Sequence, residues 1–244
     1  VCEPASLLGY NVLITTSNVH DISELQSLVE SNRVDGMLLT RALEDDRALQ
    51  YLSQVNFPTA LTGTCRYDNI IQVDTDNEGA AEKMTTLLIG KGFRRFAFLV
   101  KNMSYNVDRK RHEGFCRALI KNGISEKDQL FYNGSIRMEF LDAIIENIIS
   151  KKVECIICGD DEICTMVMSR LQAEGYRIPK DVAIASLYNS TNLDCYSPAV
   201  TAVSVAASQM GGAAVRQLIQ RLRGENYEKK TMLDYDILFR KSTN

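Results

Sequence analysis

Short apolar runs alternate with helix-patterned segments along almost the whole chain, and this alternation constrains the fold more than any other sequence feature. The helix-patterned segments carry apolar side chains three and four positions apart, and two of them close on glycine, as helices often do. Continuous apolar strands flanked by helices are typical of doubly wound α/β folds with parallel sheets. The predicted strands are residues 11–16, 35–40, 59–62, 95–100, 129–132, 154–158, 182–187 and 231–239. The predicted helices are residues 21–31, 107–122, 137–152, 161–175 and 208–224.

The chain also contains a diverged internal repeat. Three pairs of similar segments are separated by roughly 120 residues each, which favours two copies of one βα unit set and therefore two similar lobes. The paired segments start at Asn11 and Gln129, at Val34 and Val153, and at Phe57 and Ile178. Because each match is short, a coincidence of common α/β patterns is the alternative explanation.

The repeat predicts that the chain is part of a longer protein. The second copy opens with the strand at 95–100 and the helix at 107–122, and their counterparts in the first copy would precede Val1. Residues 1–8 resemble the end of that missing helix. We therefore expect an additional strand before the present start.

Composition excludes several classes of protein. There are 28 basic and 31 acidic residues, which argues against nucleic-acid binding by bulk charge alone. The chain has no apolar run near the ~20 residues of a membrane span. The seven cysteines are an odd number, and several lie in apolar runs, as is typical of reduced thiols in a cytoplasmic protein. Cys155 and Cys158 lie within one predicted strand, where alternation points them to opposite faces, so we expect no zinc site.

No metal site, cofactor site or catalytic motif is predicted. His20 and His112 are isolated, and the phosphate-binding, nucleophile-elbow and zinc-protease patterns are absent from the sequence. An α/β enzyme that uses Asp160 and Asp161 as acid and base is therefore the least favoured interpretation.

Two strand ends carry polar side chains suited to binding a ligand. The stretch 91–111 holds seven basic residues and one acid, and Arg111 lies in the first turns of the helix that follows a strand. Asp160 and Asp161 follow another apolar strand and precede a helix, so one of them is expected to cap that helix. Parallel sheets bind ligands at the carboxyl ends of their strands. The bland alternative is an Arg111–Asp160 ion pair that only fixes the lobe.

The sequence resembles the lactose/galactose repressor (LacI/GalR) family of bacterial transcription regulators over nearly the whole chain. Seven phrases occur in the order typical of the family's effector-binding core, among them R-x-x-G-F at Arg111 and a paired acidic motif at Asp160. The other five start at Gly9, Val34, Val73, Gly92 and Ile178, and a further phrase at Phe239 completes the series. The resemblance implies a two-lobed, periplasmic-binding-protein-like fold whose chain crosses between lobes near residues 100–102, 202–204 and 232–234. The expected lobes are residues 1–100 plus 203–231, and residues 101–202 plus 232–244.

The resemblance implies a repressor core rather than an enzyme. Family members carry a DNA-binding helix-turn-helix segment before the core. The resemblance implies that operator DNA is bound through such a segment, which this chain does not include. A small effector, usually a sugar or related metabolite, binds between the lobes and controls DNA binding. A transport-type solute-binding protein of the same fold is the alternative, although seven cysteines are awkward in an oxidising compartment.

Site residues follow from the same resemblance. Arg111 matches the family's effector-contacting arginine, Asp160 a pocket position, and Thr40 and Arg41 a lining segment of the first lobe. The family usually has an aspartate after the strand at 182–187, where this chain has Leu187-Tyr188-Asn189, so Tyr188 is expected in the pocket in place of a carboxylate. Two guanidinium groups would favour a small polar effector that carries an acidic or phosphorylated group.

A homodimer is also implied, because such repressors read two half-sites. The family's subunit contacts correspond to the helix at 162–171, which includes Thr165, and to the loop around Tyr196. Tyr196 could instead be a lone exposed aromatic side chain.

Overall fold

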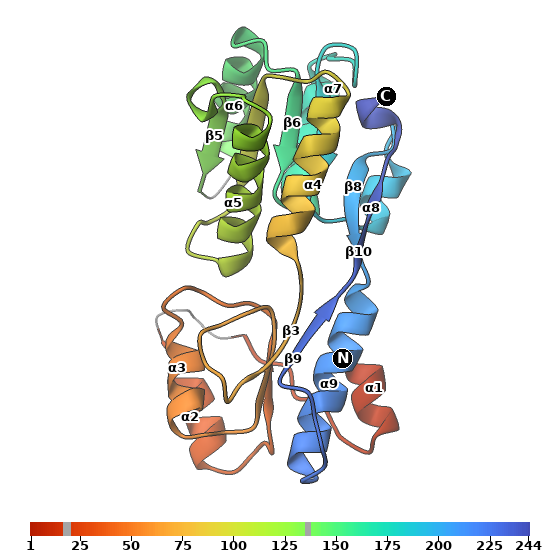
Figure 1. The fold of residues 1–244 in the computed structure, drawn as a ribbon. Coiled ribbons are helices and arrows are strands. Elements are labelled where there is room, and N and C mark those ends of the chain that lie inside the picture. The colour runs from red at the N-terminus through yellow and green to blue at the C-terminus, as the bar shows by residue number, and fades with distance from the viewer. Residues whose placement is uncertain (17–20, 135–137) are drawn as a thin grey trace. The chain divides into compact units, whose positions relative to one another are not determined.

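The computed structural model describes residues 1–16, 21–134 and 138–244, and it divides the chain into two compact units (Figure 1). The first unit comprises Val1–Thr75, Ser104–Asn106 and Ala206–Asp234. The second comprises Asp76–Met103, Val107–Val205 and Tyr235–Asn244. Each unit is therefore assembled from three separate stretches of chain.

The first unit is built on a four-stranded parallel sheet in the order β1-β2-β3-β9. Its strands are β1 (Met37–Leu39), β2 (Thr59–Thr62), β3 (Ile71–Thr75) and β9 (Lys230–Leu233). Its helices are α1 (Cys2–Leu7), α2 (Ser23–Glu30), α3 (Arg47–Gln54) and α9 (Ala207–Leu222).

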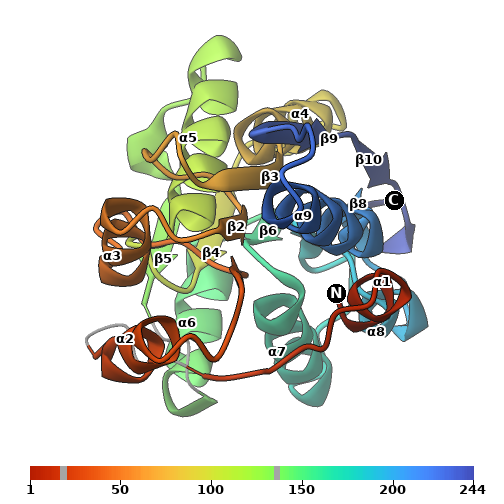
Figure 2. The same ribbon diagram turned by 90° about the horizontal axis from the view of Figure 1, so that it is seen from below.

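Alternation along β2 supplies both faces of this sheet. Ala60 packs with Ala214 and Leu218 of α9, which lies against β2 and β3 (Figure 2). The next residue, Leu61, packs on the other face with Leu49 of α3. Successive strand side chains point to opposite faces, so a continuous apolar strand requires helices on both sides.

The second unit contains a six-stranded sheet in the order β10-β8-β7-β6-β4-β5. The strands are β4 (Phe96–Val100), β5 (Leu130–Asn133), β6 (Cys155–Cys158), β7 (Ala183–Ser186), β8 (Thr201–Val205) and β10 (Tyr235–Leu238). Neighbouring strands are parallel except for β10, which runs antiparallel to β8. The α-helices are α4 (Asn77–Gly90), α5 (Asn106–Lys121), α6 (Met138–Ser150), α7 (Asp161–Ala173) and α8 (Thr191–Cys195). Two single turns of 3₁₀ helix, η1 (Glu126–Asp128) and η2 (Lys241–Thr243), complete the unit.

Two apolar cores cover the two faces of this sheet. Phe96 and Phe98 of β4 point toward α4 and α5, whereas Ala97 and Leu99 point toward α6 and α7. All four side chains are fully buried, and burial of a large apolar side chain contributes about 1.5–3 kcal/mol. The predicted doubly wound α/β architecture is confirmed.

The division between the lobes differs from the prediction in one respect. Residues 76–100 were predicted in the first lobe, whereas α4 and β4 belong to the second unit. The physical reason is pairing, because β4 lies between β5 and β6 in the six-stranded sheet. The first crossing therefore follows Thr75 instead of residue 100. Apart from the short excursion of Ser104–Asn106 into the first unit, the other two crossings follow Val205 and Asp234, within three residues of the expected positions.

The strand predicted at residues 11–16 does not form. This segment belongs to neither sheet, and Leu13 and Ile14 are 61% and 77% exposed. A strand needs a neighbour to satisfy its backbone N–H and C=O groups, and among the described residues these six have none. Two strands were not predicted, β3 and β8, and the predicted strand at 231–239 is two strands, β9 and β10, in different units.

Candidate functional site

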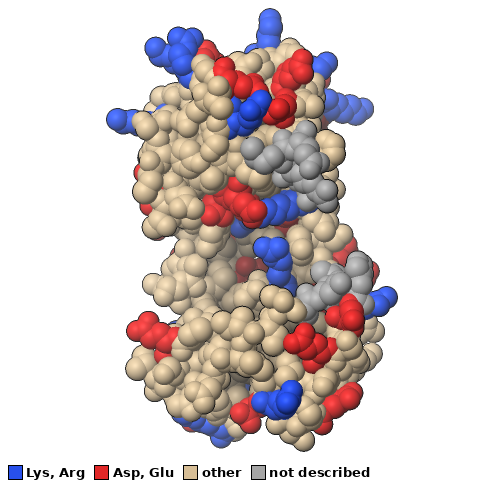
Figure 3. Space-filling model, turned by 180° about the vertical axis from the view of Figure 1, so that it is seen from behind, with Lys and Arg blue, Asp and Glu red and all other residues tan. Residues whose placement is uncertain are grey.

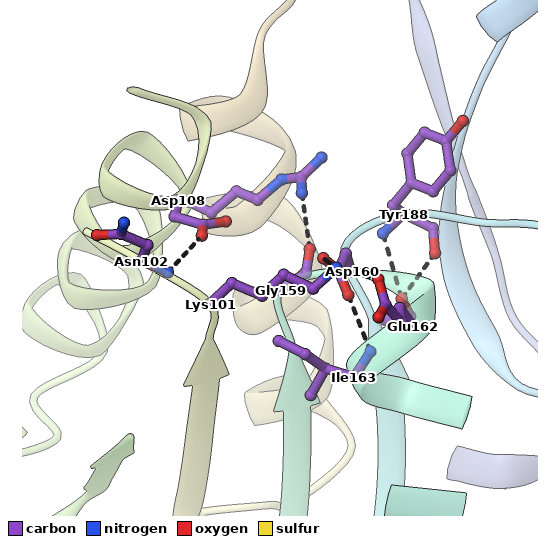
Figure 4. Close-up of polar contacts among 10 residues, drawn as sticks. Lys101, Asn102, Asp108, Gly159, Asp160, Glu162, Ile163 and Tyr188 are labelled. Carbon is purple, nitrogen blue, oxygen red and sulfur yellow. Dashed lines mark hydrogen bonds and ion pairs between the residues drawn. The ribbon is translucent and has the colours of Figure 1, made fainter. Parts of the chain in front are cut away.

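Three strands of the second unit end in register, and each places a polar side chain on the same rim. Leu99 of β4, Cys158 of β6 and Ser186 of β7 are aligned by strand pairing. Two residues beyond these positions lie Lys101, Asp160 and Tyr188. Figure 4 shows these three residues together at the carboxyl ends of the strands. Asp160 and Tyr188 therefore lie on the same rim of the sheet, and their role as pocket residues stays a prediction.

Asp160 is the N-cap of α7. Its Oδ1 accepts a hydrogen bond from the backbone N–H of Ile163 at 2.9 Å, which satisfies one of the free amides at the start of the helix. Its Oδ2 lies 2.9 Å from Nζ of Lys101. The expected cap is therefore Asp160, and a role for Asp160 in binding a ligand stays a prediction.

Lys101 is the rim residue that the sequence analysis missed. Its ammonium forms ion pairs with both Asp160 and Glu162 (Figure 4). Burial disfavours the charged form of this lysine, but hydrogen bonds from its ammonium to Glu162 and Asp160 outweigh that effect and raise its pKa. The rule that singled out Asp160, a polar residue just after a buried strand, would also have found Lys101.

Arg111 is buried behind this rim, at 7% exposure. Its Nε donates to Oδ1 of Asn77 at 3.1 Å, and its Nη1 donates to the carbonyl oxygen of Gly159 at 2.7 Å. A side chain at position 159 would collide with Val100, so only glycine lets β6 end this close to β4. The guanidinium of Arg111 therefore contacts the peptide group between Gly159 and Asp160.

The loop after β7 carries Tyr188 and a second polar side chain, Asn189. The backbone N–H and C=O of Tyr188 both bond to the hydroxyl of Ser186, while its ring points away from these bonds (Figure 4). Oδ1 of Asn189 accepts from Arg240 at 2.9 Å. Asn189 was not among the predicted site residues. Its position beside Tyr188 in a strand-end loop was the available signal.

Thr40 and Arg41 belong to the first unit. Thr40 is exposed directly after β1, and the guanidinium carbon of Arg41 lies 4.9 Å from the centre of the Tyr105 ring. Their role as pocket residues stays a prediction.

Tyr196 and Thr165, the predicted dimer residues, contact each other within the second unit. The Tyr196 hydroxyl lies 3.3 Å from the carbonyl oxygen of Thr165 and 2.9 Å from Oγ of Ser169. The ring is half-buried against the core beneath α7, so Tyr196 is not a lone exposed aromatic residue. Participation of either residue in a dimer stays a prediction.

A hollow of about 870 Å³ lies at the opposite, amino-terminal end of the same strands. Its two acidic residues are already paired, Glu154 with Arg95 and Asp181 with Arg177. Several helices end here, and cations are favoured at helix carboxyl termini. Figure 3 shows positive and negative side chains interspersed at this end of the second unit. The basic residues of the hollow are therefore explained without a ligand.

The described residues limit other kinds of site. Among them, no three His, Cys, Asp or Glu side chains lie close enough to hold a metal ion. Cys155 and Cys158 do lie on opposite faces of β6, as alternation predicted, and all seven cysteines are free. His20 lies outside the described residues. No described helix is both long and apolar enough to cross a bilayer.

Comparison with known proteins gives a consistent result. The family model of the periplasmic binding protein-like domain matches residues 85–243. The chain belongs to this family. It is 26% identical to the HTH-type transcriptional regulator CelR of Thermobifida fusca, over 95% of this chain and 70% of that protein. A solved complex of the regulator CelR with cellobiose superposes with a TM-score of 0.87 at 26% identity, covering 99% of this chain and 76% of that one.

A second solved structure extends the likeness. A structure assigned as the transcriptional regulator LacI of Bacillus cereus subsp. cytotoxis has a TM-score of 0.90 and 28% identity, covering 98% of this chain and 88% of that one. Within the periplasmic binding protein-like family, the chain is therefore the effector-binding core of a LacI-type transcription regulator. The resemblance noted in the sequence is confirmed, and these relatives are regulators, not enzymes or transport components.

Proposed function

We propose that the rim formed by Lys101, Asp160, Tyr188 and Asn189, backed by Arg111, binds a neutral, hydroxyl-rich effector of the sugar class. The observation that carries this proposal is the alignment of Lys101, Asp160 and Tyr188 on three neighbouring strands. Together they offer an ammonium, a carboxylate and a phenol, groups that donate to and accept from hydroxyls. Effector binding at this rim controls operator DNA binding by a cytoplasmic homodimer, and no catalysis is involved.

The charge of the rim favours a neutral ligand over the acidic one expected from the sequence. That expectation rested on two guanidinium groups, those of Arg41 and Arg111. In the structure Arg41 stacks on Tyr105 within the first unit, and the positive charge of Lys101 is offset by Asp160 and Glu162. Cellobiose, which is bound to the similar regulator CelR, is therefore the first ligand to test.

A thermal-shift screen followed by calorimetry tests the proposal. The set comprises cellobiose, maltose, glucose, gluconate, glucose 6-phosphate and adenosine. A ligand at 100 times its Kd should add about 2.7 kcal/mol of stability. We expect stabilisation by a neutral sugar. Stabilisation by gluconate or glucose 6-phosphate alone would contradict the neutral class, and stabilisation by adenosine alone, or by no compound of the set, would contradict a sugar-class effector.

Arg111→Ala checks the location of the site. The substitution removes the hydrogen bonds that Arg111 donates to the Gly159 carbonyl oxygen and to the Asn77 amide oxygen. We therefore expect the free energy of unfolding to fall by about 2 kcal/mol and sugar binding to be lost. Arg177→Met is the control, because Arg177 is an exposed arginine of the same unit whose partner among the described residues is Asp181. Unchanged affinity in a folded Arg111→Ala protein would place the site elsewhere.

A further inference from the structure

The segment after β10 is bonded tightly to the strands that carry the rim loops. The Ser242 hydroxyl donates to the carbonyl oxygen of Ile184 at 2.6 Å and accepts from the backbone N–H of Thr201 at 2.8 Å. The backbone N–H of Arg240 donates to Oγ1 of Thr201 at 2.9 Å. Ser242 and Thr201 are fully buried, so Arg240 projects from a base fixed to β7 and β8.

From this base the Arg240 side chain reaches three points of the loop between β7 and β8. Its Nη1 donates to Oδ1 of Asn189 at 2.9 Å and to the carbonyl oxygen of Val200 at 2.6 Å. Its Nη2 forms an ion pair with Asp194 on α8. These acceptors lie at the start, middle and end of the loop, and the rigid fork of a guanidinium suits such multiple contacts. The side chain is only 17% exposed, which limits competition from water.

The helix within this loop, α8, has no side-chain cap at its first turn. α8 has only five residues, and Ser190 precedes it without making a side-chain cap. Short uncapped helices are unstable by themselves. Leu193, which is fully buried, and the ion pair between Asp194 and Arg240 attach α8 to the rest of the unit.

The two ends of the loop meet different surfaces. Tyr188 and Asn189 lie at the rim, whereas the Tyr196 hydroxyl bonds to Ser169 and to the Thr165 carbonyl oxygen on the exposed side of α7. Arg240 contacts the loop on both sides of α8. Its contacts therefore connect the part of the loop at the rim with the part that follows Tyr196.

We propose that Arg240 is a positioning residue that makes residues 188–200 move as one body, so that occupancy of the rim is transmitted to the surface formed by Tyr196 and α7. The transmission of effector binding rests on the function proposed above. The ordering of residues 188–200 as one body by Arg240 does not rest on that function, and it can be tested without any ligand.

Hydrogen exchange of backbone amides, measured on the chain without ligand, tests the unity of the loop. The informative amides are those of Leu193, bonded to the Ser190 carbonyl oxygen, and Val200, bonded to the Leu193 carbonyl oxygen. We expect Arg240→Met to increase exchange at both by roughly tenfold or more, since hydrogen bonds to charged groups are lost. Arg240→Lys, which keeps the charge but not the fork, should restore part of the protection. Arg177→Met, the exposed control, should leave both amides unchanged.

Coupling between the two ends distinguishes positioning from simple stabilisation. Tyr196→Phe removes the hydroxyl contacts near one end of the loop, and we expect it to raise exchange at the other end, at the backbone N–H of Tyr188, which bonds to the Ser186 hydroxyl. In an Arg240→Met background that remote effect should disappear. Strictly additive effects of the two substitutions, or no change in Arg240→Met, would overturn the proposal.

A second pair of variants covers the case in which Arg240→Met does not fold. Asn189→Ala and Asp194→Ala each remove one acceptor of the guanidinium, and each should raise exchange across the whole loop. An increase confined to the substituted position would overturn the proposal. Absence of sugar binding in the screen above would contradict the proposed function. It would not affect these exchange results or the positioning role of Arg240.

Discussion

Asp160 uses its two carboxylate oxygens for different purposes. One caps α7 through the backbone N–H of Ile163, and the other faces Lys101 at the rim. Asparagine caps helices about as well as aspartate but carries no charge. The two purposes are therefore separable by substitution.

We expect Asp160→Asn to fold with nearly unchanged stability and to bind the effector more weakly. Asp160→Ala should lose about 1 kcal/mol of stability as well, because the cap is removed. Urea unfolding and calorimetry measure the two effects, and Asp161→Ala is the control, since the cap belongs to Asp160. An Asp160→Asn protein that binds sugar normally would restrict this residue to its structural role.

His112 offers a prediction of pH dependence. It is half-buried, with its ring centre 4.3 Å from that of Phe131 and 5.7 Å from that of Phe98. Burial lowers its pKa below the ordinary 6.5 and outweighs the opposing effect of Glu126 and Glu113. Below pH 6.5 the unfolded chain thus binds more protons at this position than the folded chain, so stability falls as the pH drops through that value.

The measurement compares thermal unfolding at pH 7.5 and pH 5.5, a window above the carboxylate pKa range. His112→Leu should have a smaller decrease in Tm over this window than the unsubstituted protein. An equal decrease in both proteins would show that His112 does not control stability there.

At the scale of elements, α5 illustrates why a short motif has a fixed spacing. Arg111 faces Gly159 and Asn77, Phe115 packs on Phe98 with ring centres 4.7 Å apart, and Gly114 lies against α4. A Cβ atom at Gly114 would overlap the carbonyl oxygen of Glu78. The glycine of R-x-x-G-F is therefore required by the close approach of α4 and α5.

Substitution of two glycines by alanine should change stability in opposite directions. Gly114→Ala should lose about 1–3 kcal/mol, as expected for overpacking, despite its higher helix propensity. Gly90→Ala, at the end of α4 with open space around it, should be neutral or gain about 0.5–1 kcal/mol. Chemical denaturation of both variants provides the comparison. A stabilised Gly114→Ala protein would mean that α4 and α5 separate easily.

The elements also show what the sequence determines by itself. Strands β4, β6 and β7 are continuous apolar runs buried on both faces, and all three were predicted within a residue or two. β3 was missed because buried Gln72 and Asp74 interrupt its apolar pattern. The segment 11–16 has a strand's composition but no neighbour, and pairing is not visible in the local sequence.

The rim was predicted in part for a related reason. Asp160 and Tyr188 were found because polar residues after buried strands are easy to recognise. Lys101 was counted only as one member of a basic stretch, and its pairing with Asp160 depends on the alignment of two strands that are far apart in sequence. The hydrogen bond between Arg240 and Asn189 likewise joins residues that are far apart in sequence.

At the scale of the whole molecule, dimerisation is the remaining prediction. We expect Tyr196→Asp to shift the protein toward monomer, because it places a charge at the predicted subunit contact. Tyr196→Phe keeps the ring but removes the two hydrogen bonds of the hydroxyl, and it should remain dimeric. This variant therefore distinguishes a role of the ring at the subunit contact from a role of the hydroxyl within the protomer. Sedimentation velocity over a range of concentrations measures the change. A Tyr196→Asp protein that folds and sediments like the unsubstituted one would remove Tyr196 from the interface.

The three crossings have a consequence for synthesis on the ribosome. β3 of the first unit pairs with β9, and β8 of the second pairs with β10, yet β9 and β10 are separated only by Asp234. Neither sheet is complete until the last part of the chain has been translated, on the order of ten seconds after β3 at ordinary rates. During that interval the β3 edge, which β9 will cover, and the β2–β3 face, which α9 will cover, are open to other nascent chains and to chaperones. Termination of translation before β9 would leave each of the two sheets without the strand that pairs at its edge.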